Sequence, residues 1–181
     1  MNLADIRHCV RVANLSMSLA DVLNLPQKEK EELYISALFH DIGKAFLNQE
    51  ILNKPGPLTD LERKHIETHS VFSYRESKNV GFSKVIADNI LYHHENFDGT
   101  GYPLRINGSK IPLASRIIKI TDTFDALTCD RPYRKALSAQ EALRIMNKQR
   151  SQYDPQLYLS FTHLLDGSTK NFEIYDYQRT N

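Results

Sequence analysis

Apolar residues recur at intervals of three and four along most of this chain, which is the spacing of one face of an α-helix. In the first segment this stripe contains Leu3, Ile6, Val10, Ala13, Met17 and Ala20. The pattern predicts an all-α fold, a single-domain helical bundle of about seven helices. We expect the domain to occupy residues 1–165, with a C-terminal tail at 166–181 that packs on it or extends from it. The stretch NFEIYDYQ in that tail is either a weak strand or an ordered extension.

Capping residues and helix breakers set the limits of the predicted helices. The Pro-Gly-Pro run at 55–57 prevents regular structure before the third helix. Thr59 and Glu62 form the T-x-x-E pattern of a capping box that begins this helix, and Ser83 is positioned to cap the fourth. The predicted helices cover residues 3–20, 27–44, 59–75, 83–94 and 112–127, a segment from 138 with a second capping box at Ser138 and Glu141, and 154–165.

The composition excludes several classes of protein. At 181 residues and 20.9 kDa the chain is long enough for one domain with a sizeable core. A net charge of +1 gives no basic signature, so a long nucleic acid is not an expected partner. Cys9 and Cys129 form no CxxC pair, which favours a reducing, cytoplasmic compartment. Charged residues interrupt the N-terminus and no apolar run reaches about eighteen residues, so we expect neither a signal peptide nor membrane insertion.

Histidine and aspartate side chains fall on the faces that these helices would bury. His8 lies on the apolar face of the first segment, the His40-Asp41 pair ends the apolar run YISALF, and Asp122 lies within SRIIKITDTFDAL. A buried carboxylate without a partner costs several kcal/mol, so these groups need hydrogen-bond partners or cations. A single histidine of this kind is more often an ordinary core residue. His69, one turn before Phe72, brings a fourth helix into this set. Four helices that each supply imidazole or carboxylate to one interior favour divalent cations, which satisfy both kinds of group.

The stretch YHHENFDGTGYP at residues 92–103 places two consecutive histidines before a glycine-rich loop. Adjacent side chains on a helix point about 100° apart, so neighbouring imidazoles bring little to one apolar face. A metal centre can use both, with one ligand along each direction. Gly99 and Gly101 allow close backbone approach or positive φ, and Pro103 stiffens the exit of the loop.

Four sequence blocks occur in order: HDIGK at 40–44, NKPGPLT at 53–59, YHHENFDGTGYP at 92–103 and DALTCDRPYRKAL at 125–137. Together they resemble the HD-GYP domain, a branch of the HD metal-dependent phosphohydrolases, from about residue 8 to residue 161. The resemblance implies an all-α fold with a metal centre buried in the helical bundle. It also implies a cyclic di-GMP phosphodiesterase, an enzyme that uses metal-activated hydroxide to produce pGpG, GMP or both.

The resemblance implies seven metal ligands. Asp41 has two oxygens and is expected to bridge two divalent cations. Imidazole and carboxylate donors suit iron or manganese, with zinc as an alternative. His65, four residues before His69, matches no ligand position, and His163 is expected to be an ordinary surface or packing histidine. The implied ligands are His8, His40, Asp41, His69, His93, His94 and Asp122.

Lys44 lies three residues after Asp41, and the resemblance implies a catalytic role for both. Lys44 would stabilise phosphate or the leaving oxygen; the alternative is a solvated lysine at a helix end. The RPYRK block at 131–135 suits phosphate, because guanidinium groups pair with phosphate oxygens bidentately. Tyr102 would stack on a guanine or, as the alternative, pack its loop onto the bundle. The implied substrate-binding residues are Tyr102, Arg131, Arg134 and Asp125, the last of which would orient one of the arginines.

Three features depart from the family pattern. Ser70 and Ser73 stand where the family often has the proline and glycine of an HPxxG motif. Arg105 takes a glycine position that usually follows GYP, and we expect it to change the rim of the pocket. Ala4 stands where members with three metals carry a glutamate, so we expect two cations.

Two other functions remain open. One is a non-catalytic HD-GYP module that binds a nucleotide or another protein; the HD pair, Lys44 and the paired histidines weigh against it. The other is a general HD-type nucleotidase acting on mononucleotides, which leaves the HHE-to-GYP block and RPYRK unexplained. We expect no sensor module before the domain, so that regulation would come from a partner or from ligand supply. The expected partners beyond a cyclic dinucleotide are a diguanylate cyclase domain or a separate sensor protein.

Overall fold

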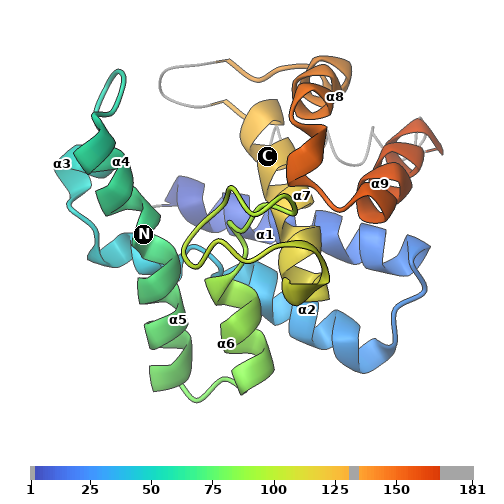
Figure 1. Cartoon of the computed structure of the whole chain (residues 1–181), viewed down its shortest axis with the longest axis horizontal. Coiled ribbons are helices and arrows are strands. Elements are labelled where there is room, and N and C mark those ends of the chain that lie inside the picture. Colours follow the sequence, from blue (N-terminus) through green and yellow to red (C-terminus); the bar gives the residue numbers. More distant parts are fainter. Residues whose placement is uncertain (1–2, 131–134, 168–181) are drawn as a thin grey trace.

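A computed structural model describes residues 3–130 and 135–167, and all regular structure within these ranges is helical (Figure 1). The all-α fold predicted from the periodicity is therefore confirmed. The α-helices are α1 (Leu3–Val22), α2 (Gln27–Phe39), α3 (Gln49–Leu52), α4 (Asp60–Glu67), α5 (His69–Asn79), α6 (Lys84–Leu91), α7 (Leu113–Thr128), α8 (Ala139–Lys148) and α9 (Pro155–Gly167). Three short 3₁₀-helices join them: η1 (Ile42–Phe46), η2 (Gly108–Lys110) and η3 (Arg150–Gln152).

The hydrophobic core lies between α1, α2, α7, α8 and α9. Val12 and Leu19 of α1 and Leu33 of α2 are almost fully buried in it. Phe124 of α7 meets Phe161 of α9 edge to face, with the ring centroids 5.3 Å apart. Full burial of a side chain of this size contributes roughly 1.5–3 kcal/mol. The core thus fixes α1, α2 and α7 relative to one another. Candidate site residues lie in α1 and α7, and His40 and Asp41 directly follow α2.

Three helices begin at the predicted capping residues. Thr59 and Glu62 form a complete capping box at the start of α4, as do Ser138 and Glu141 at the start of α8. The hydroxyl of Ser83 accepts from the backbone at the start of α6. Such caps each contribute about 1 kcal/mol because they satisfy N–H groups that the helix leaves unpaired.

The predicted third helix is two helices in the structure. The helix is interrupted at Thr68, between α4 and α5. The second helix, α5, continues to Asn79, beyond the predicted end at Arg75. The Thr68 hydroxyl donates to the carbonyl oxygen of His65 at 2.6 Å, which competes with the regular helical hydrogen bond. The break makes His69 the first residue of α5, at the edge of the bundle interior.

The predicted second helix also ends early. It is α-helical only to Phe39, and the HDIGK segment continues as η1. Gly43 lies so close to α5 that a Cβ atom would be 2.1 Å from the carbonyl oxygen of His69, which leaves no room for a regular helical turn with a side chain. The break at Thr68 and the short α3 explain why the described residues contain nine α-helices where the sequence predicts about seven.

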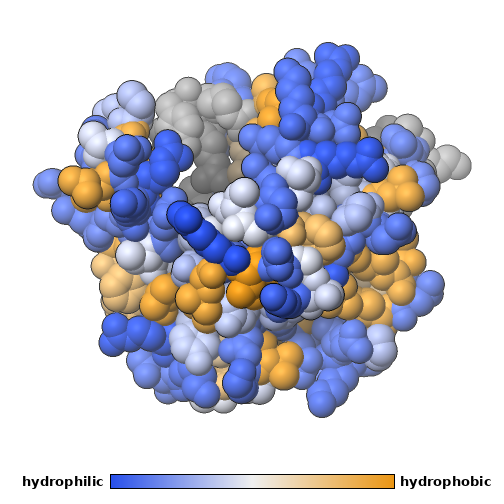
Figure 2. Space-filling model, viewed as in Figure 1, coloured by the Kyte–Doolittle hydropathy of each residue, from blue (hydrophilic) through white to orange (hydrophobic). Residues whose placement is uncertain are grey.

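Hydrophilic residues cover most of the face in Figure 2, with apolar residues in scattered groups between them. This mixture is ordinary for a protein surface. Within residues 3–130 and 135–167, the helices are too short or too polar to cross a membrane. Of the predicted tail at 166–181, residues 166 and 167 belong to α9, and the rest lies outside the described residues.

Candidate metal centre

Several helix ends meet inside the bundle. His40 and Asp41 follow α2, His69 begins α5, and His93 and His94 follow α6. The ends of helices suit such a centre because their backbone groups lack intrahelical partners and can orient side chains. Two further groups come from within helices, His8 of α1 and Asp122 of α7.

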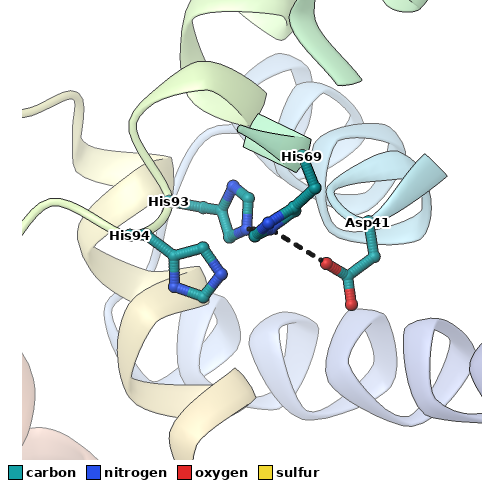
Figure 3. Close-up of side chains that lie close together, drawn as sticks. All are labelled: Asp41, His69, His93 and His94. Carbon is teal, nitrogen blue, oxygen red and sulfur yellow. Dashed lines mark hydrogen bonds and ion pairs between the residues drawn. The ribbon is translucent and has the colours of Figure 1, made fainter. Parts of the chain in front are cut away.

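Asp41 lies between two groups of imidazoles. Its Oδ1 is 3.3 Å from Nε2 of His69 (Figure 3). Its Oδ2 is 3.3 Å from Nε2 of His40 and 3.6 Å from Nε2 of His8. Each oxygen therefore faces a different group, which is the arrangement of a carboxylate that bridges two cations. The ammonium of Lys44 also reaches Oδ2, at 2.5 Å.

Three of the histidines are oriented by the same kind of hydrogen bond to the backbone. Nδ1 of each donates to the carbonyl oxygen three residues earlier, at 2.7 Å for His40, 2.7 Å for His69 and 2.6 Å for His93. These carbonyl groups belong to the last turns of α2, α4 and α6, where carbonyl groups lack the regular helical partner four residues later. A donating Nδ1 leaves the Nε2 lone pair available to a cation.

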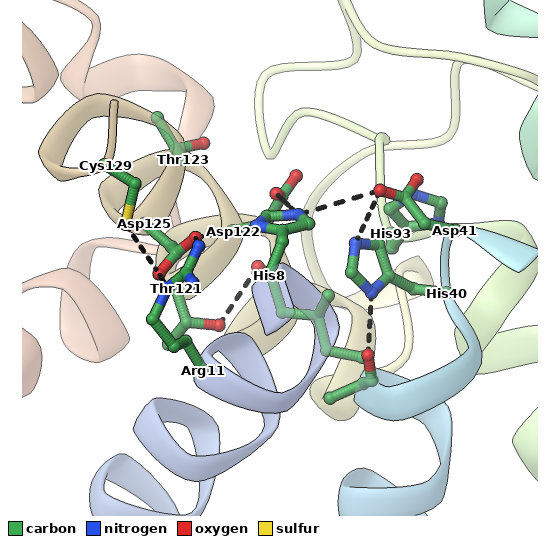
Figure 4. A network of polar contacts seen from close by, with 12 residues as sticks. His8, Arg11, His40, Asp41, His93, Thr121, Asp122, Thr123, Asp125 and Cys129 are labelled. Carbon is green, nitrogen blue, oxygen red and sulfur yellow. Dashed lines mark hydrogen bonds and ion pairs between the residues drawn. The ribbon is translucent and has the colours of Figure 1, made fainter. Parts of the chain in front are cut away.

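His8 is held differently, by a carboxylate from α7. Its Nδ1 donates to Oδ2 of Asp125 at 2.7 Å, and its Nε2 lies 3.1 Å from Oδ1 of Asp122 (Figure 4). Arg11 binds the same Asp125 with two hydrogen bonds of 2.7 and 2.9 Å. The structure thus places Asp125 directly behind a candidate ligand, a position that the sequence did not predict. Its predicted role in substrate binding stays a prediction.

Burial and neighbouring charges separate the protonation states in this cluster. Burial disfavours the charged carboxylate of Asp41, but Lys44 and His40 outweigh it and hold the pKa of Asp41 well below its usual range. Burial and the neighbouring imidazoles lower the pKa values of His93 and His94 well below 6.5. Near neutral pH the carboxylate is therefore ionised and these imidazoles are neutral, which are the states that bind cations.

The pKa values of His8 and His40 are shifted in the opposite direction, upward. Burial disfavours protonated His8, yet its hydrogen bonds to Asp122 and Asp125 raise the pKa of His8 to about 9. Burial likewise opposes a charge on His40, and the negative charge of Asp41 outweighs it, so the pKa of His40 is raised. A cation that binds Nε2 of His8 and Nε2 of His40 must displace protons from these residues, so the affinity for the cation increases with pH.

The donor set fits divalent cations. Nε2 of His40 and Oδ1 of Asp41 are buried and have no hydrogen-bond partner in the part of the chain that the structure describes. Unpaired buried polar atoms are costly, and a cation satisfies both. The candidate ligands form two groups that share Asp41, and within each group the ligand atoms lie within 4.8 Å of one another. The first group is Asp41, His69, His93 and His94, and the second is His8, His40 and Asp41.

The glycine-rich loop that ends in the GYP motif at residues 101–103 lies over this cluster. The rings of Tyr102 and His94 are stacked, with centroids 4.8 Å apart. Burial raises the pKa of Tyr102, so its phenol stays neutral. The buried Glu95 carboxylate accepts from the backbone N–H of Leu104 at 2.7 Å, and a Cβ atom at Gly101 would be 2.5 Å from the carbonyl oxygen of His94. The packing role of Tyr102 is thus present, and its contact with substrate stays a prediction.

The serines that depart from the family pattern have local partners. Ser73 accepts from the backbone N–H of Gly43 at 2.8 Å, and so joins η1 to α5. Ser70 donates to the carbonyl oxygen of Glu67 at 3.2 Å. Arg105 is exposed and has a φ of 56°, a conformation that glycine adopts readily.

The structure brings all seven predicted ligands into one region, while His65 and His163 stay apart from it. His65 accepts from the backbone N–H of Asn48 at 3.1 Å, and His163 is exposed. The sequence did not predict the part played by Arg11, although a cation three residues after His8 on the same helical face was a usable signal. The predicted substrate contacts Arg131 and Arg134 lie outside the described residues, and the side chain of Ala4 does too.

A family model described as "HD domain" matches residues 4–157. The chain belongs to the HD domain family. This HD domain is 40% identical over 157 residues to the "Cyclic di-GMP phosphodiesterase PA4108" of Pseudomonas aeruginosa, covering 85% of this chain and 37% of the relative. It is also 40% identical over 154 residues to the "3'3'-cGAMP-specific phosphodiesterase 1" of Vibrio cholerae, covering 84% and 36%. The chain therefore spans little more than a third of the length of these relatives.

Solved structures share the fold of this HD domain. Bd1817, an HDG"Y"P protein from Bdellovibrio bacteriovorus, matches with a TM-score of 0.71 at 22% identity, covering 88% of this chain and 51% of that chain. The HD domain of the L. monocytogenes phosphodiesterase PgpH, in complex with cyclic-di-AMP, matches with a TM-score of 0.68 at 19% identity, covering 92% and 90%. At these identities the similarity shows the fold. With the family model and the relatives, it confirms the HD-GYP resemblance.

Proposed function

We propose that this HD domain is a metal-dependent phosphodiesterase that hydrolyses a cyclic dinucleotide, with cyclic di-GMP as the first substrate to test. The observation that carries the proposal is the position of Asp41, whose two oxygens face separate groups of imidazoles. The names of relatives at 40% identity, phosphodiesterases for cyclic di-GMP and for 3'3'-cGAMP, support the substrate class.

Two divalent cations are the proposed cofactors. Imidazole and carboxylate donors suit iron or manganese, with zinc as an alternative. When bound, two cations depress the pKa of a water and neutralise charge on the phosphoryl oxygens. Asp41, His69, His93 and His94 would hold one cation, and His8, His40, Asp41 and the adjacent Asp122 the other.

The protein's own groups have separate proposed roles. Asp41 stays ionised and fixes the two halves of the centre relative to each other. Lys44 carries three N–H donors, so it can contact both Asp41 and a phosphate oxygen of the substrate. Tyr102 covers His94 and offers a neutral phenol as a hydrogen-bond donor. Arg131 and Arg134 remain proposed phosphate contacts on the grounds of residue type and family position.

The direct test is to incubate metal-loaded protein separately with cyclic di-GMP, 3'3'-cGAMP, cyclic di-AMP and dGTP, and to separate the products by chromatography. We expect a cyclic dinucleotide to be converted to its linear form, to mononucleotides or to both, and dGTP to remain intact. Cleavage of dGTP alone would identify a mononucleotide-hydrolysing enzyme instead. Binding of a cyclic dinucleotide without cleavage, in protein that contains both metals, would identify a non-catalytic module.

Two neighbouring histidines provide a matched comparison. His69→Gln removes a candidate ligand that is 1% exposed, and we expect it to lower metal content and abolish hydrolysis. His65→Gln changes a histidine one turn earlier that contacts Asn48 outside the cluster, and we expect metal content and activity to stay at the wild-type level. Asp41→Asn should lose hydrolysis and metal together. Full activity in Asp41→Asn with undiminished metal would remove Asp41 from the centre.

The remaining parts of the proposal concern partners and location. A diguanylate cyclase domain or a separate sensor protein stays a predicted partner. The cytoplasmic location rests on cysteine usage, since Cys9 and Cys129 form no disulfide within the described residues.

A further inference from the structure

His8 differs from three of the other candidate histidine ligands in how its ring is oriented. His40, His69 and His93 each donate from Nδ1 to a carbonyl oxygen three residues earlier. His8 lies in the first half of α1, where backbone carbonyl groups are already bonded along the helix. It therefore needs an acceptor from elsewhere in the fold, and Asp125 of α7 supplies it at 2.7 Å.

The acceptor is itself held by a guanidinium group. Nε and one terminal nitrogen of Arg11 bind the two oxygens of Asp125, at 2.7 and 2.9 Å (Figure 4). The Asp125 side chain is 0% exposed and that of Arg11 only 17%. Cys129 adds a thiol 3.5 Å from Oδ1 of Asp125. A two-bond fork fixes the plane of a carboxylate as well as its position, which a single bond from an ammonium does not.

We propose that Arg11 is a positioning residue that acts through Asp125 to orient His8 as a metal ligand. The Arg11–Asp125 pair holds Oδ2 of Asp125 against Nδ1 of His8, so that Nε2 points toward Asp41 and Asp122. Partners that orient ligating imidazoles affect metal affinity about 10–100-fold when they are removed. The inference rests on the metal-dependent function proposed above.

The effect is specific to one half of the centre. His8 belongs to the group that contains His40 and Asp41, whereas His69, His93 and His94 form the other group with Asp41. Within the described residues, the histidine that bonds to Asp125 is His8 and none of the last three. Loss of the guanidinium group should therefore weaken one cation site and leave the other at its original affinity.

The test is equilibrium dialysis of the chelator-treated full chain against Mn²⁺, with the bound metal counted by elemental analysis. We expect wild-type protein to bind two ions and Arg11→Gln to bind the first with unchanged affinity. The second should bind about 10–100-fold more weakly in Arg11→Gln. Arg11→Lys keeps the charge without the planar fork, so its second site should lie between these values. In electron paramagnetic resonance, Arg11→Gln should give the signal of isolated Mn²⁺ where wild-type protein shows a coupled pair.

Arg7 provides the control. It is an exposed arginine one turn earlier on α1, and Arg7→Gln should bind both ions as wild-type protein does. A double-mutant comparison isolates the route: in a His8→Gln background, where the second site is already weakened, Arg11→Gln should weaken that second site no further. An undiminished second site in Arg11→Gln, or an equal loss at both sites, would overturn the inference. Equal losses at both sites would mean that Arg11 only supports the fold.

Dialysis needs no substrate, so the positioning role of Arg11 and the proposed phosphodiesterase activity are tested independently. If Arg11→Gln loses one ion but no cyclic dinucleotide is cleaved by wild-type protein, the positioning role stands and the phosphodiesterase proposal falls. If wild-type protein cleaves a cyclic dinucleotide and Arg11→Gln retains both ions, the reverse holds. Arg11→Lys keeps the test available if Arg11→Gln does not fold.

Discussion

At the scale of single residues, Arg105 holds a backbone conformation that suits glycine. Its φ is 56°, in the exposed stretch after the GYP motif. The left-handed conformation costs an L-residue about 1–2 kcal/mol, while glycine adds unfolded-state freedom that costs about 0.4–1 kcal/mol. We therefore expect Arg105→Gly to raise the free energy of unfolding by up to about 1 kcal/mol, as measured by urea denaturation.

Lys110 is the matched control for this substitution. It is also an exposed basic residue, but its φ is not positive, so Lys110→Gly should lower the free energy of unfolding. Equal losses in Arg105→Gly and Lys110→Gly would show that residue 105 is not strained. The same Arg105→Gly protein also tests whether the arginine affects the choice between cyclic dinucleotides, as its position beside the GYP motif predicts.

The candidate ligands could be predicted from the sequence, while their supporting contacts could not. HD and HHE are local motifs whose residue types already indicate metal chemistry. The contact between His8 and Asp125 joins positions separated by 117 residues, and it depends on how α1 crosses α7. Ser73 shows the same limit, because its hydroxyl is explained only by the approach of Gly43 from η1.

At the scale of elements, η1 packs directly on α5 through Gly43. A Cβ atom at this position would be 2.1 Å from the carbonyl oxygen of His69 and 2.5 Å from the backbone nitrogen of Ser73. Both obstacles are backbone atoms, so Gly43→Ala must push the two elements apart. We expect a loss of about 1–3 kcal/mol in the free energy of unfolding from this overpacking. We also expect reduced metal content, because Asp41 directly precedes η1 and His69 begins α5.

Gly108 separates the steric effect from the conformational one. It has a φ of 56°, and a Cβ atom added there would meet nothing within 4 Å. Gly108→Ala should therefore cost about 1 kcal/mol in stability through its backbone conformation and leave metal content unchanged. If Gly43→Ala kept its full metal content while losing stability, the contact would serve the fold and not the geometry of the centre.

Element starts were predicted better than element ends. Thr59, Ser83 and Ser138 cap helices as predicted, because a capping residue acts on the backbone of its own next turn. The break at Thr68 had no such local signal, since no glycine or proline is present and both sides of it keep a helical pattern. At this break η1 packs against the start of α5. Such packing belongs to the tertiary structure, so the sequence pattern of the helix alone does not predict it.

At the scale of the whole molecule, the cluster of imidazoles and carboxylates links stability to pH and to metal. In metal-free protein, the folded-state pKa of His8 is about 9, above its ordinary value of 6.5. The stabilisation from protonated His8 is therefore fully present below about pH 6.5 and is lost as the pH rises through about 9. His93 and His94 have lowered pKa values, so below about pH 6.5 the unfolded chain binds protons that the folded protein does not. The stability of metal-free protein should accordingly be greatest near pH 6.5 and fall on both sides.

Bound cations should change this profile on its alkaline side. A cation takes the place of the proton on His8 and His40, so its stabilising effect grows as these protons become easier to displace. We expect the difference in Tm between metal-loaded and chelator-treated protein to increase from about pH 6 to about pH 9, as measured by calorimetry. His8→Gln should reduce the alkaline loss in metal-free protein and leave the part that comes from His40, whereas His163→Gln, a change at an exposed histidine, should leave the whole loss intact. A Tm difference that stays constant over this range, or an alkaline loss that is undiminished in His8→Gln, would show that the proton on His8 is not what the metal displaces.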